Sequence, residues 1–353
     1  MKRLAFFFGA LLTASVAQSA EIPTSGKGHV QNPVWSPDGA WLAYEVNNLS
    51  NSVDLWLVKV DGGMGTQPRQ LRIPGASRGF GAGGTVVAAP AWTSKPQTML
   101  FFEGSNAGGL LRIYYAMPGS ASPNEFIDSN TQAGNLSSPT MAADGTRFAF
   151  AGDSRGKGDI MMIDFAAGST VTEVANTSAS ENFPAFAPSG KAVSFSRKGN
   201  GEDLFYWSDS GQENTISKAA GDQTRPRFVS DSEVVFFTSE RGEGRWDVAV
   251  APVSGGRSRI VTRDVRLPAR AAPALTPDGK HVVVVSANPA EGDKIRIVSL
   301  ENGSSQEIAT GLVACGEPSV VTSGGRSWLA FTALPSAGAD WRGLHVLDIT
   351  GKY

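Results

Sequence analysis

Three histidines and one cysteine are the side chains of this sequence best suited to nucleophilic or metal chemistry. They are His29, His281, His345 and Cys315 among 353 residues. A Ser–His–Asp triad or a metal centre requires such groups to converge in space. The histidines are far apart in the sequence, and no histidine lies near Cys315. We therefore expect each to be a surface or packing residue, with no catalytic residue, no metal and no cofactor.

Two further patterns that could bind phosphate or calcium are incomplete. The segment GDSRGKGD at 152–159 has one residue too few for a phosphate-binding loop, and Gly158 stands where that loop needs Ser or Thr. Asp153 and Asp159 could ligate Ca²⁺, but no Asp-x-Asp-x-Asp-Gly loop surrounds them. The segment is predicted to be a loop between strands.

The overall composition predicts a chain that turns often. The formal net charge is -2, which argues against nucleic acid, because a phosphate-binding protein normally has a marked basic excess. The sequence contains 41 Gly and 20 Pro residues. Such frequent Gly and Pro favour many short strands over long helices.

The first residues, MKRLAFFFGALLTASVAQSA, are typical of a secretory signal. Lys2 and Arg3 precede a short apolar stretch and then small residues, so cleavage after Ala17 or Ala20 is expected. We expect residues 1–20 to be removed, residues 21–353 to form one domain, and no transmembrane segment to remain. This arrangement predicts a periplasmic or secreted protein. A single cysteine excludes an internal disulfide, so the core must suffice for stability.

A repeat based on proline runs through the rest of the sequence. Each unit begins with Pro ahead of an apolar pair, as in NPVW at 32–35 and APAL at 272–275. The prolines are Pro33, Pro90, Pro139, Pro184, Pro226, Pro273 and Pro318, and their spacings are 57, 49, 45, 42, 47 and 45 residues. Seven units of this length fill the chain, and the first is enlarged by PGASRGFGAGGTVVAAP at 74–90.

Each unit continues with a turn and three more strands. The turns include SPDG at 36–39 and TPDG at 276–279, where Pro fixes one dihedral, Asp bonds its own backbone and Gly accepts positive φ. The second strands, such as WLAYEV at 41–46 and HVVVVSA at 281–287, are apolar on both faces. Strands of this kind are covered above and below.

Four antiparallel strands per repeat of this length predict a β-propeller. We expect an all-β ring of seven blades, with six blades as the alternative. The seventh unit ends after its third strand, and EIPTSGKGHVQ at 21–31 precedes the first unit without a partner. Residues 21–25 are therefore predicted to pair with 343–349 and close the ring.

The segments WSPDGAWLAYEV, DLWLVKVDGG and RQL of the first unit resemble the TolB-like propeller repeat, a WD40-like repeat family. The resemblance is good in the third, fourth and sixth units and weak in the second and fifth. It implies a protein-binding ring in the periplasm. TolB itself has six blades and a separate N-terminal α/β domain, for which this sequence has no room, so the Tol–Pal role is not implied.

Similar propellers also occur in enzymes. Those of the prolyl-oligopeptidase type need a hydrolase domain with a Gly-x-Ser-x-Gly elbow, and we expect neither here. Seven-bladed oligogalacturonate lyases use a His-rich metal site, which three scattered histidines argue against. We therefore expect a non-enzymatic, monomeric scaffold that binds a protein or peptide partner at the cell envelope. The alternative is a channel-centred polysaccharide lyase or hydrolase-like enzyme.

The expected binding surface is the face with the second-to-third strand loops and the inter-blade connections, because these loops are longer and more varied. The residue before each repeat proline should lie at the channel mouth on this face. A basic sector near Arg263, Arg266 and Arg270 could accept an acidic peptide, or could be neutralised by nearby carboxylates. The candidate binding residues are Asn32, Arg78, Phe80, Arg225, Arg227, Trp246, Glu317 and Trp341.

Overall fold

The computed structural model describes most of the chain. The described ranges are 19–24, 28–48, 52–66, 68–73, 85–106, 108–120, 122–127, 132–154, 157–288 and 292–353, without the side chain of Asn288. Residues 1–18 of the predicted signal, and the candidate residues Arg78 and Phe80, lie outside these ranges. The predicted domain boundaries therefore stay predictions.

The described residues form antiparallel sheets built mostly from four strands each. One four-stranded sheet contains β7 (Val87–Thr93), β8 (Met99–Ser105), β9 (Leu111–Ala116) and β10 (Asn124–Glu125), and a second contains β11 (Leu136–Met141), β12 (Arg147–Gly152), β13 (Asp159–Asp164) and β14 (Val171–Ala175). A third contains β15 (Ser180–Phe186), β16 (Ala192–Lys198), β17 (Glu202–Ser208) and β18 (Glu213–Ser217). In a fourth, β1 (Ala20–Ile22) joins β27 (Val313–Ser323), β28 (Arg326–Leu334) and β29 (Gly343–Asp348).

Two larger sheets complete the described fold. One is five-stranded and contains β2 (His29–Trp35), β3 (Trp41–Asn47), β4 (Val53–Asp61), β5 (Met64–Gly65) and β6 (Arg69–Leu71). The other is eight-stranded and contains β19 (Gln223–Ser230), β20 (Glu233–Thr238), β21 (Trp246–Pro252), β22 (Arg259–Val265), β23 (Ala274–Leu275), β24 (His281–Asn288), β25 (Gly292–Ser299) and β26 (Ser305–Ile308).

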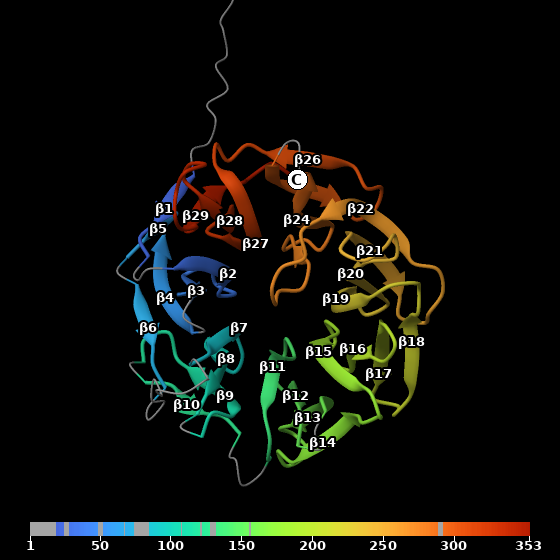
Figure 1. Cartoon of the computed structure of the whole chain (residues 1–353). Helices are drawn as coiled ribbons and strands as arrows, with labels where there is room; N and C mark the ends of the chain where they lie inside the picture. The colour runs from blue at the N-terminus through green and yellow to red at the C-terminus, as the bar shows by residue number, and fades with distance from the viewer. Residues whose placement is uncertain are drawn as a thin grey trace, which may run out of the picture.

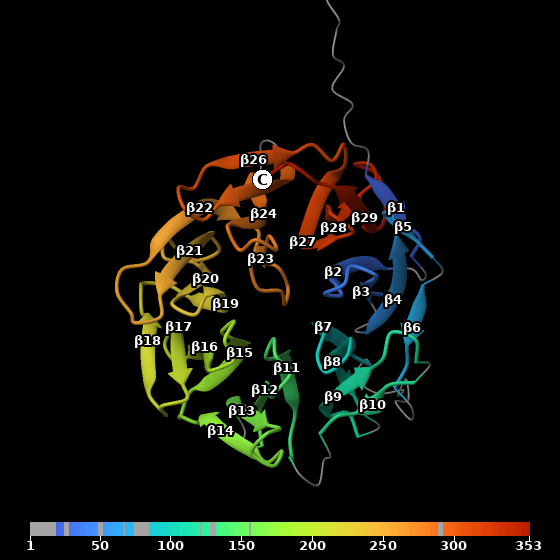
Figure 2. The same cartoon turned by 180° about the vertical axis from the view of Figure 1, so that it is seen from behind.

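The sheets are arranged side by side around a central axis, as Figures 1 and 2 show from opposite sides. The first strand of each unit, such as β2, β7 and β11, lies nearest this axis. The strands predicted from the repeat therefore form the all-β, antiparallel architecture of a β-propeller. No helix with the length and apolar character needed to cross a membrane occurs among the described residues.

The turns at 36–39 and 276–279 form because a hydroxyl and a carboxylate hold the bend. Ser36 Oγ donates to Asp38 Oδ1 at 2.5 Å, and the backbone N–H of Trp41 donates to Ser36 Oγ at 2.9 Å. Thr276 repeats the first bond with Asp278 at 2.6 Å. Gly39 has φ 69, which Gly adopts without the steric cost of a Cβ atom. The same short sequence thus makes the same turn in distant units.

The core lies between adjacent sheets. Ala43, Leu55 and Leu57 of the five-stranded sheet pack in one cluster with Leu100 and Phe102 of the next. All five are almost fully buried. The second strands are apolar on both faces because each face meets a neighbouring sheet.

The eight-stranded sheet consists of two four-stranded groups joined at a single residue pair. Val265 at the end of β22 pairs with Ser286 of β24. After Val265 the chain leaves the sheet, and it rejoins only at β23, where Ala274 pairs with Val283. Residues 266–273, which we call the inner loop, extend toward the centre of the ring in the orange part of Figures 1 and 2.

The N-terminal strand pairs with the last strand of the chain. Ala20, Glu21 and Ile22 pair with Val346, His345 and Leu344, respectively. Ile22 is fully buried in a cluster that includes Val58 and Leu344. The predicted contact between the segment from residue 21 and strand 343–349 is present, although the described strand is Ala20–Ile22 and is shorter than predicted.

Candidate functional site

The residue before the repeat proline has an unusual backbone in six of the seven units. Its φ is positive at Asn32, Ala89, Ser138, Phe183, Arg225 and Glu317, with values from 46 to 54. A residue before proline normally adopts an extended conformation, and a non-glycine residue seldom has positive φ. The strand register shifts at each of these sites, so six innermost strands each contain a β-bulge at the same position of the repeat.

Ala272 is the exception to this pattern. In its unit the innermost strand is reduced to Ala274–Leu275, and the inner loop replaces the bulge. Ala272 belongs to the inner loop and lines the pocket beside it. Its backbone differs from that of the other six because the inner loop carries residues 266–273 away from the strand, so no ladder forces the chain into a bulge there. The prediction that these residues lie at the channel mouth stays a prediction.

Three glutamates accept hydrogen bonds from the bulged residues. The backbone N–H of Asn32 donates to Glu317 at 2.6 Å, that of Ala89 donates to Glu45 at 2.8 Å, and that of Ser138 donates to Glu103 at 2.8 Å. Each glutamate belongs to the preceding unit in the ring. These carboxylates therefore connect neighbouring sheets near the axis, and they satisfy N–H groups that the bulges leave free.

Two arginines hold the inner loop, one outside the loop and one within it. Arg225 donates to the carbonyl oxygens of Pro268 and Ala269, the latter at 2.9 Å. Arg270 of the loop donates to Glu103 Oε2 at 2.6 Å. The guanidinium of Arg225 also lies 5.3 Å from the ring centroid of Phe183. The loop is thus fixed to β19 and, through Arg270, to β8 of a distant unit.

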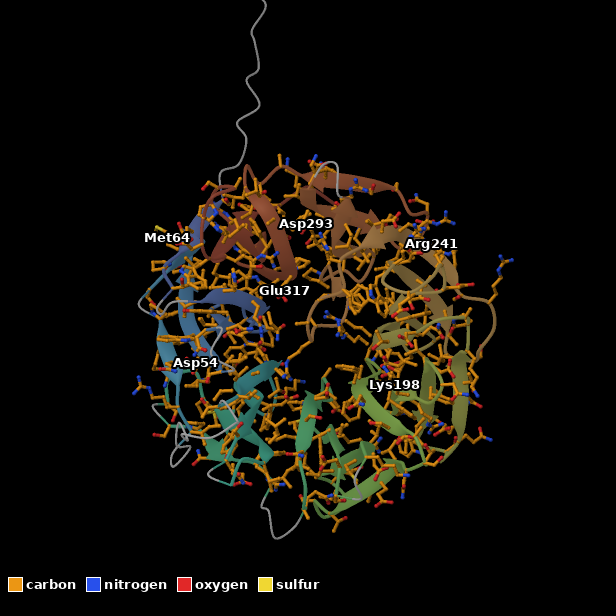
Figure 3. All side chains as sticks on the ribbon, in the orientation of Figure 1. Asp54, Met64, Lys198, Arg241, Asp293 and Glu317 are labelled. Carbon is orange, nitrogen blue, oxygen red and sulfur yellow. The ribbon has the colours of Figure 1, made fainter. Side chains whose placement is uncertain are left out.

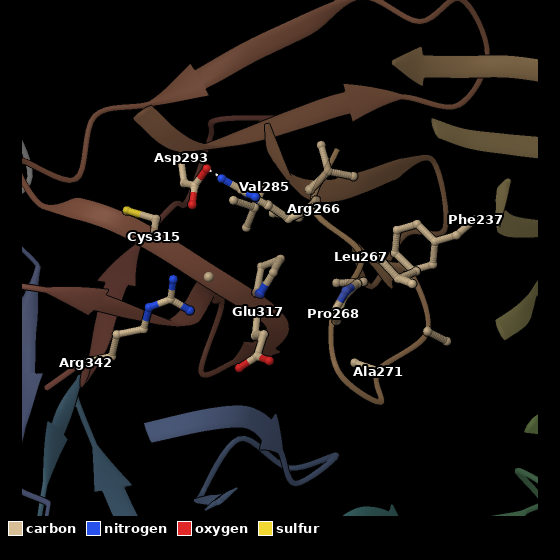
Figure 4. A pocket seen from close by; sticks show the side chains of 16 residues that line it. Phe237, Arg266, Leu267, Pro268, Ala271, Val285, Asp293, Cys315, Glu317 and Arg342 are labelled. Atoms are coloured by element: carbon tan, nitrogen blue, oxygen red, sulfur yellow. Dashed lines mark hydrogen bonds and ion pairs between the residues drawn. The ribbon is translucent and has the colours of Figure 1, made fainter. Parts of the chain in front are cut away.

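A pocket of about 270 Å³ lies beside the inner loop. Its walls come from the loop itself, from β24 and from β27, and Figure 4 shows them from close by. Polar groups in the wall are Arg266, Asp293, Cys315, Glu317 and Arg342. Arg342 and Asp293 each stand near the start of a third strand, so the pocket belongs to the face of the second-to-third strand loops. Figure 3 places Glu317 near the ring centre and Met64 at the outer rim.

Burial controls the ionisation of several groups at this site. Burial raises the pKa of Glu317, against the lowering effect of the Asn32 N–H bond. Burial likewise raises the pKa of Glu103 more than the Arg270 guanidinium lowers it. It raises the pKa of the Cys315 thiol and lowers the pKa of Arg225 to about 10. A thiol whose pKa is raised is a poor nucleophile at neutral pH.

Two of the predicted binding residues have structural contacts. Asn32 is 5% exposed, and its Nδ2 donates to Glu45 at 2.8 Å. Arg225 is 8% exposed and supports the inner loop. Of the expected basic sector, Arg270 pairs with Glu103 and Arg266 pairs with Asp293 at 2.8 Å, so both are neutralised. The alternative of a neutralised surface holds for these two arginines.

The other predicted binding residues differ in exposure. Arg227 is exposed, and it donates to the carbonyl oxygen of Pro273 at 3.3 Å. Trp246 packs, partly buried, against the cluster between β21 and β24. Trp341 is 37% exposed and meets His29 edge to face, with ring centroids 5.2 Å apart. Glu317 lines the pocket. A binding role for these residues stays a prediction.

The histidines occupy three separate settings. His29 Nδ1 accepts a bond from the backbone N–H of Arg342 at 3.3 Å. His281 lies beside Tyr353, and His345 is buried against Phe331. Within the ranges that the structure describes, no three His, Cys, Asp or Glu side chains are grouped so that they could hold a metal ion.

One statement about the sequence needs correction. We expected no Gly-x-Ser-x-Gly pattern, but the sequence contains it twice, as GASRG at 75–79 and as GDSRG at 152–156. The first lies outside the described ranges, and of the second only Gly152, Asp153 and Ser154 are described, at the end of β12 and just after it. A nucleophile elbow also requires a turn from a strand into a helix, so the letters alone do not identify one.

A comparison with protein-family models decides the family. The model of the TolB beta propeller domain matches residues 123–331, which is more than half of the chain. The chain belongs to the TolB β-propeller family. No curated protein matches it. The sequence-based resemblance to TolB-like repeats is therefore confirmed, and the match covers the third to sixth units with the end of the second and the beginning of the seventh.

Solved structures share the fold of this TolB-family chain at low sequence identity. TolB from Acinetobacter baumannii matches with a TM-score of 0.54 and 17% identity over 77% of this chain. The chain spans 64% of the length of that TolB. An oligogalacturonate lyase from Vibrio parahaemolyticus matches with a TM-score of 0.60 and 12% identity, covering 93% of this chain and 91% of the lyase.

A hydrolase also shares the fold. The puromycin hydrolase S511A mutant, in complex with PGG, matches with a TM-score of 0.62 and 13% identity, covering 92% of this chain and 54% of the hydrolase. Identities this low establish the fold alone. They therefore leave the activity of the TolB-family chain open.

Sequence reasoning missed Arg342, the inner loop, and the roles of Glu45 and Glu103. The two glutamates occupy the same place in WLAYEV and MLFFEG, where most other units have uncharged residues, and this contrast was an available signal. The eight residues between Val265 and Ala274 in RLPARAAP also hold two arginines ahead of the repeat proline. No signal in the sequence distinguishes Arg342 from the other arginines.

Proposed function

We propose that this chain is a non-enzymatic scaffold of seven blades that binds a protein or peptide partner. Its proposed location is the periplasm or the secreted space, its role lies in cell-envelope processes, and it is a monomer. The blade count is supported by the division of the eight-stranded sheet, whose halves β19–β22 and β23–β26 share the single pair Val265 and Ser286. The pairing of β1 with β29 supports closure by the N-terminal strand.

The observation that carries the binding function is the pairing of an exposed aromatic ring with an adjoining pocket. Trp341 is 37% exposed, and the next residue, Arg342, lines the pocket of about 270 Å³. Tryptophan and arginine are the side chains most enriched among residues that dominate interface energetics. Both lie where the loop between β28 and β29 ends.

The absence of a catalytic role is supported by how the inner carboxylates are used. Glu45 accepts from Gln31, Asn32 and Ala89, with each bond 2.8 Å long. Glu103 accepts from Ser138 and Arg270. A carboxylate whose oxygens already accept from several fixed donors has little capacity left to accept a proton from a substrate. These groups are suited to holding the ring together.

The test is a quantitative crosslinking pull-down from periplasmic extract with the wild-type protein, Trp341→Ala and Met64→Ala. Met64 is 71% exposed at the outer rim, so its variant is a control for loss of an exposed apolar side chain. We expect Trp341→Ala to lose most of the specifically captured protein and Met64→Ala to retain it. Equal capture by all three would refute this binding surface. Turnover of a polygalacturonate or peptide substrate by purified protein would instead support the channel-centred enzyme.

A further inference from the structure

Building on the proposed function, we infer that the pocket beside the inner loop binds the C-terminal residue of a peptide. The free α-carboxylate contacts the guanidinium of Arg342, and an apolar last side chain packs against the inner wall. The pocket combines a guanidinium that has no ion-pair partner among the described residues with several apolar side chains in its wall. A peptide chain end with an apolar last residue offers the complementary groups. The inference rests on the proposed peptide-binding function and names the ligand group that the site recognises.

Arg342 is held in place while its charge stays available. Its carbonyl oxygen accepts from the backbone N–H of Val30 at 3.2 Å, and its own N–H donates to His29 Nδ1 at 3.3 Å. A Cβ atom added at Gly316 would lie 3.2 Å from Arg342 Nη1, so the guanidinium packs over a residue without a side chain. Among the described residues, no carboxylate lies within ion-pair distance of this guanidinium. A positioned guanidinium is well suited to bidentate carboxylate binding.

The acidic groups at the pocket are occupied elsewhere. Asp293 pairs with Arg266 at 2.8 Å. The Glu317 carboxylate turns toward β2 in Figure 4, where its Oε2 accepts the N–H of Asn32 at 2.6 Å. Burial raises the pKa of Glu317 more than the nearby Arg342 guanidinium lowers it, which weakens repulsion of an anionic ligand. Arg342 is thus the charged group in the described lining that a ligand carboxylate can neutralise.

The rest of the lining suits an apolar side chain. Phe237, Leu267, Pro268, Val283 and Val285 all contribute to the wall. The volume of about 270 Å³ is just below the 300 to 1,000 Å³ typical of sites for drug-sized ligands, so it suits about one residue. The inner loop, β24 and β27 bound the pocket on three sides. This enclosure favours a chain end over a strand that continues through the site.

The test uses two pools of random pentapeptides, one with free C-termini and one with C-terminal amides, applied to immobilised full-length protein. Retained peptides are identified by mass spectrometry. We expect the free-acid pool to be retained about tenfold or more over the amide pool, because hydrogen bonds between charged groups are the strong ones. The retained peptides should be enriched in apolar last residues.

Three variants locate the site. Arg342→Gln should abolish the preference for the free acid, while Arg342→Lys should retain part of it because the charge remains. Arg326→Gln is the matched control, since Arg326 is an exposed arginine of the same sheet. Thermal unfolding of each variant checks that the fold is intact.

The outcomes separate the inference from the function on which it rests. Equal retention of acid and amide pools by the wild type, or an unchanged preference in a folded Arg342→Gln, means that this inference is wrong while peptide binding stands. Retention of neither pool contradicts the inference and the proposed peptide binding together. If N-acetyl-leucine competes for the pocket with the same affinity as the pentapeptides, the pocket binds small apolar acids and the peptide assignment is wrong.

Discussion

Arg270 Nη1 lies 2.6 Å from Glu103 Oε2, although the two residues are 167 positions apart in the chain. The arginine comes from the inner loop between β22 and β23, and the glutamate comes from β8. This ion pair therefore fixes the inner loop to a distant part of the ring. Because Glu103 is 2% exposed, its carboxylate has little access to water as a substitute partner.

Removing the arginine of this pair should destabilise the protein. Arg270→Gln leaves Glu103 Oε2 without its cation, and we expect the free energy of unfolding to fall by about 1–3 kcal/mol. The measurement is urea denaturation of Arg270→Gln, Glu103→Gln and the double variant. A coupling free energy near zero in this cycle would contradict a direct interaction.

The raised pKa of Glu317 predicts a pH effect on stability. A carboxyl whose pKa is higher in the folded protein contributes most stability below its unfolded pKa, and the contribution is lost as pH rises through the folded pKa. The ordinary value is 4.5, so the window extends upward from about pH 4.5. The unfolding free energy of wild type should therefore decline more steeply above this pH than that of Glu317→Gln. Glu307→Gln, which alters an exposed carboxylate, is the control. Parallel curves for wild type and Glu317→Gln would show that the idea is wrong.

The bulge before each proline predicts an unusual order of substitution effects. Ser138 has φ 52, where glycine is free of steric cost and a β-branched residue is strongly disfavoured. We expect Ser138→Gly to be about as stable as wild type, and Ser138→Val to be less stable than Ser138→Gly by about 1–2 kcal/mol. Chemical denaturation measures both. A valine variant as stable as the glycine variant would argue against the positive φ.

The N-terminal strand predicts a large effect from one small residue change. Ile22 is fully buried and pairs with Leu344, so Ile22→Ala should lower the unfolding free energy by about 2–4 kcal/mol. Hydrogen exchange at the backbone of β29 should also increase. Glu21→Gln, at an exposed position of the same strand, is the control and should change stability by less than about 0.5 kcal/mol. An Ile22→Ala variant with unchanged stability would remove the case for a closing strand.

The sequence by itself determined the repeating local structure. Turns such as 36–39 and 276–279 are fixed by hydroxyl, carboxylate and glycine within a few residues, so their sequence is enough to predict them. The strands with two apolar faces predicted sheets covered on both sides, because alternation of side chains is a local property. The pairing of the N-terminal segment with the last strand could also be predicted, because the seventh unit has only three strands and the segment 21–31 belongs to no other unit.

Only the tertiary structure decided which residues meet around the axis. The contact between Arg270 and Glu103, and the seat of Arg342 between His29 and Gly316, join residues that no spacing in the sequence relates. The bulge at Ser138 was equally hidden, because proline alone favours an extended neighbour and the ring overrides that preference with a hydrogen bond from Ser138 to Glu103. Local patterns fix the blades because neighbouring residues make them, whereas the candidate site arises where separate blades converge.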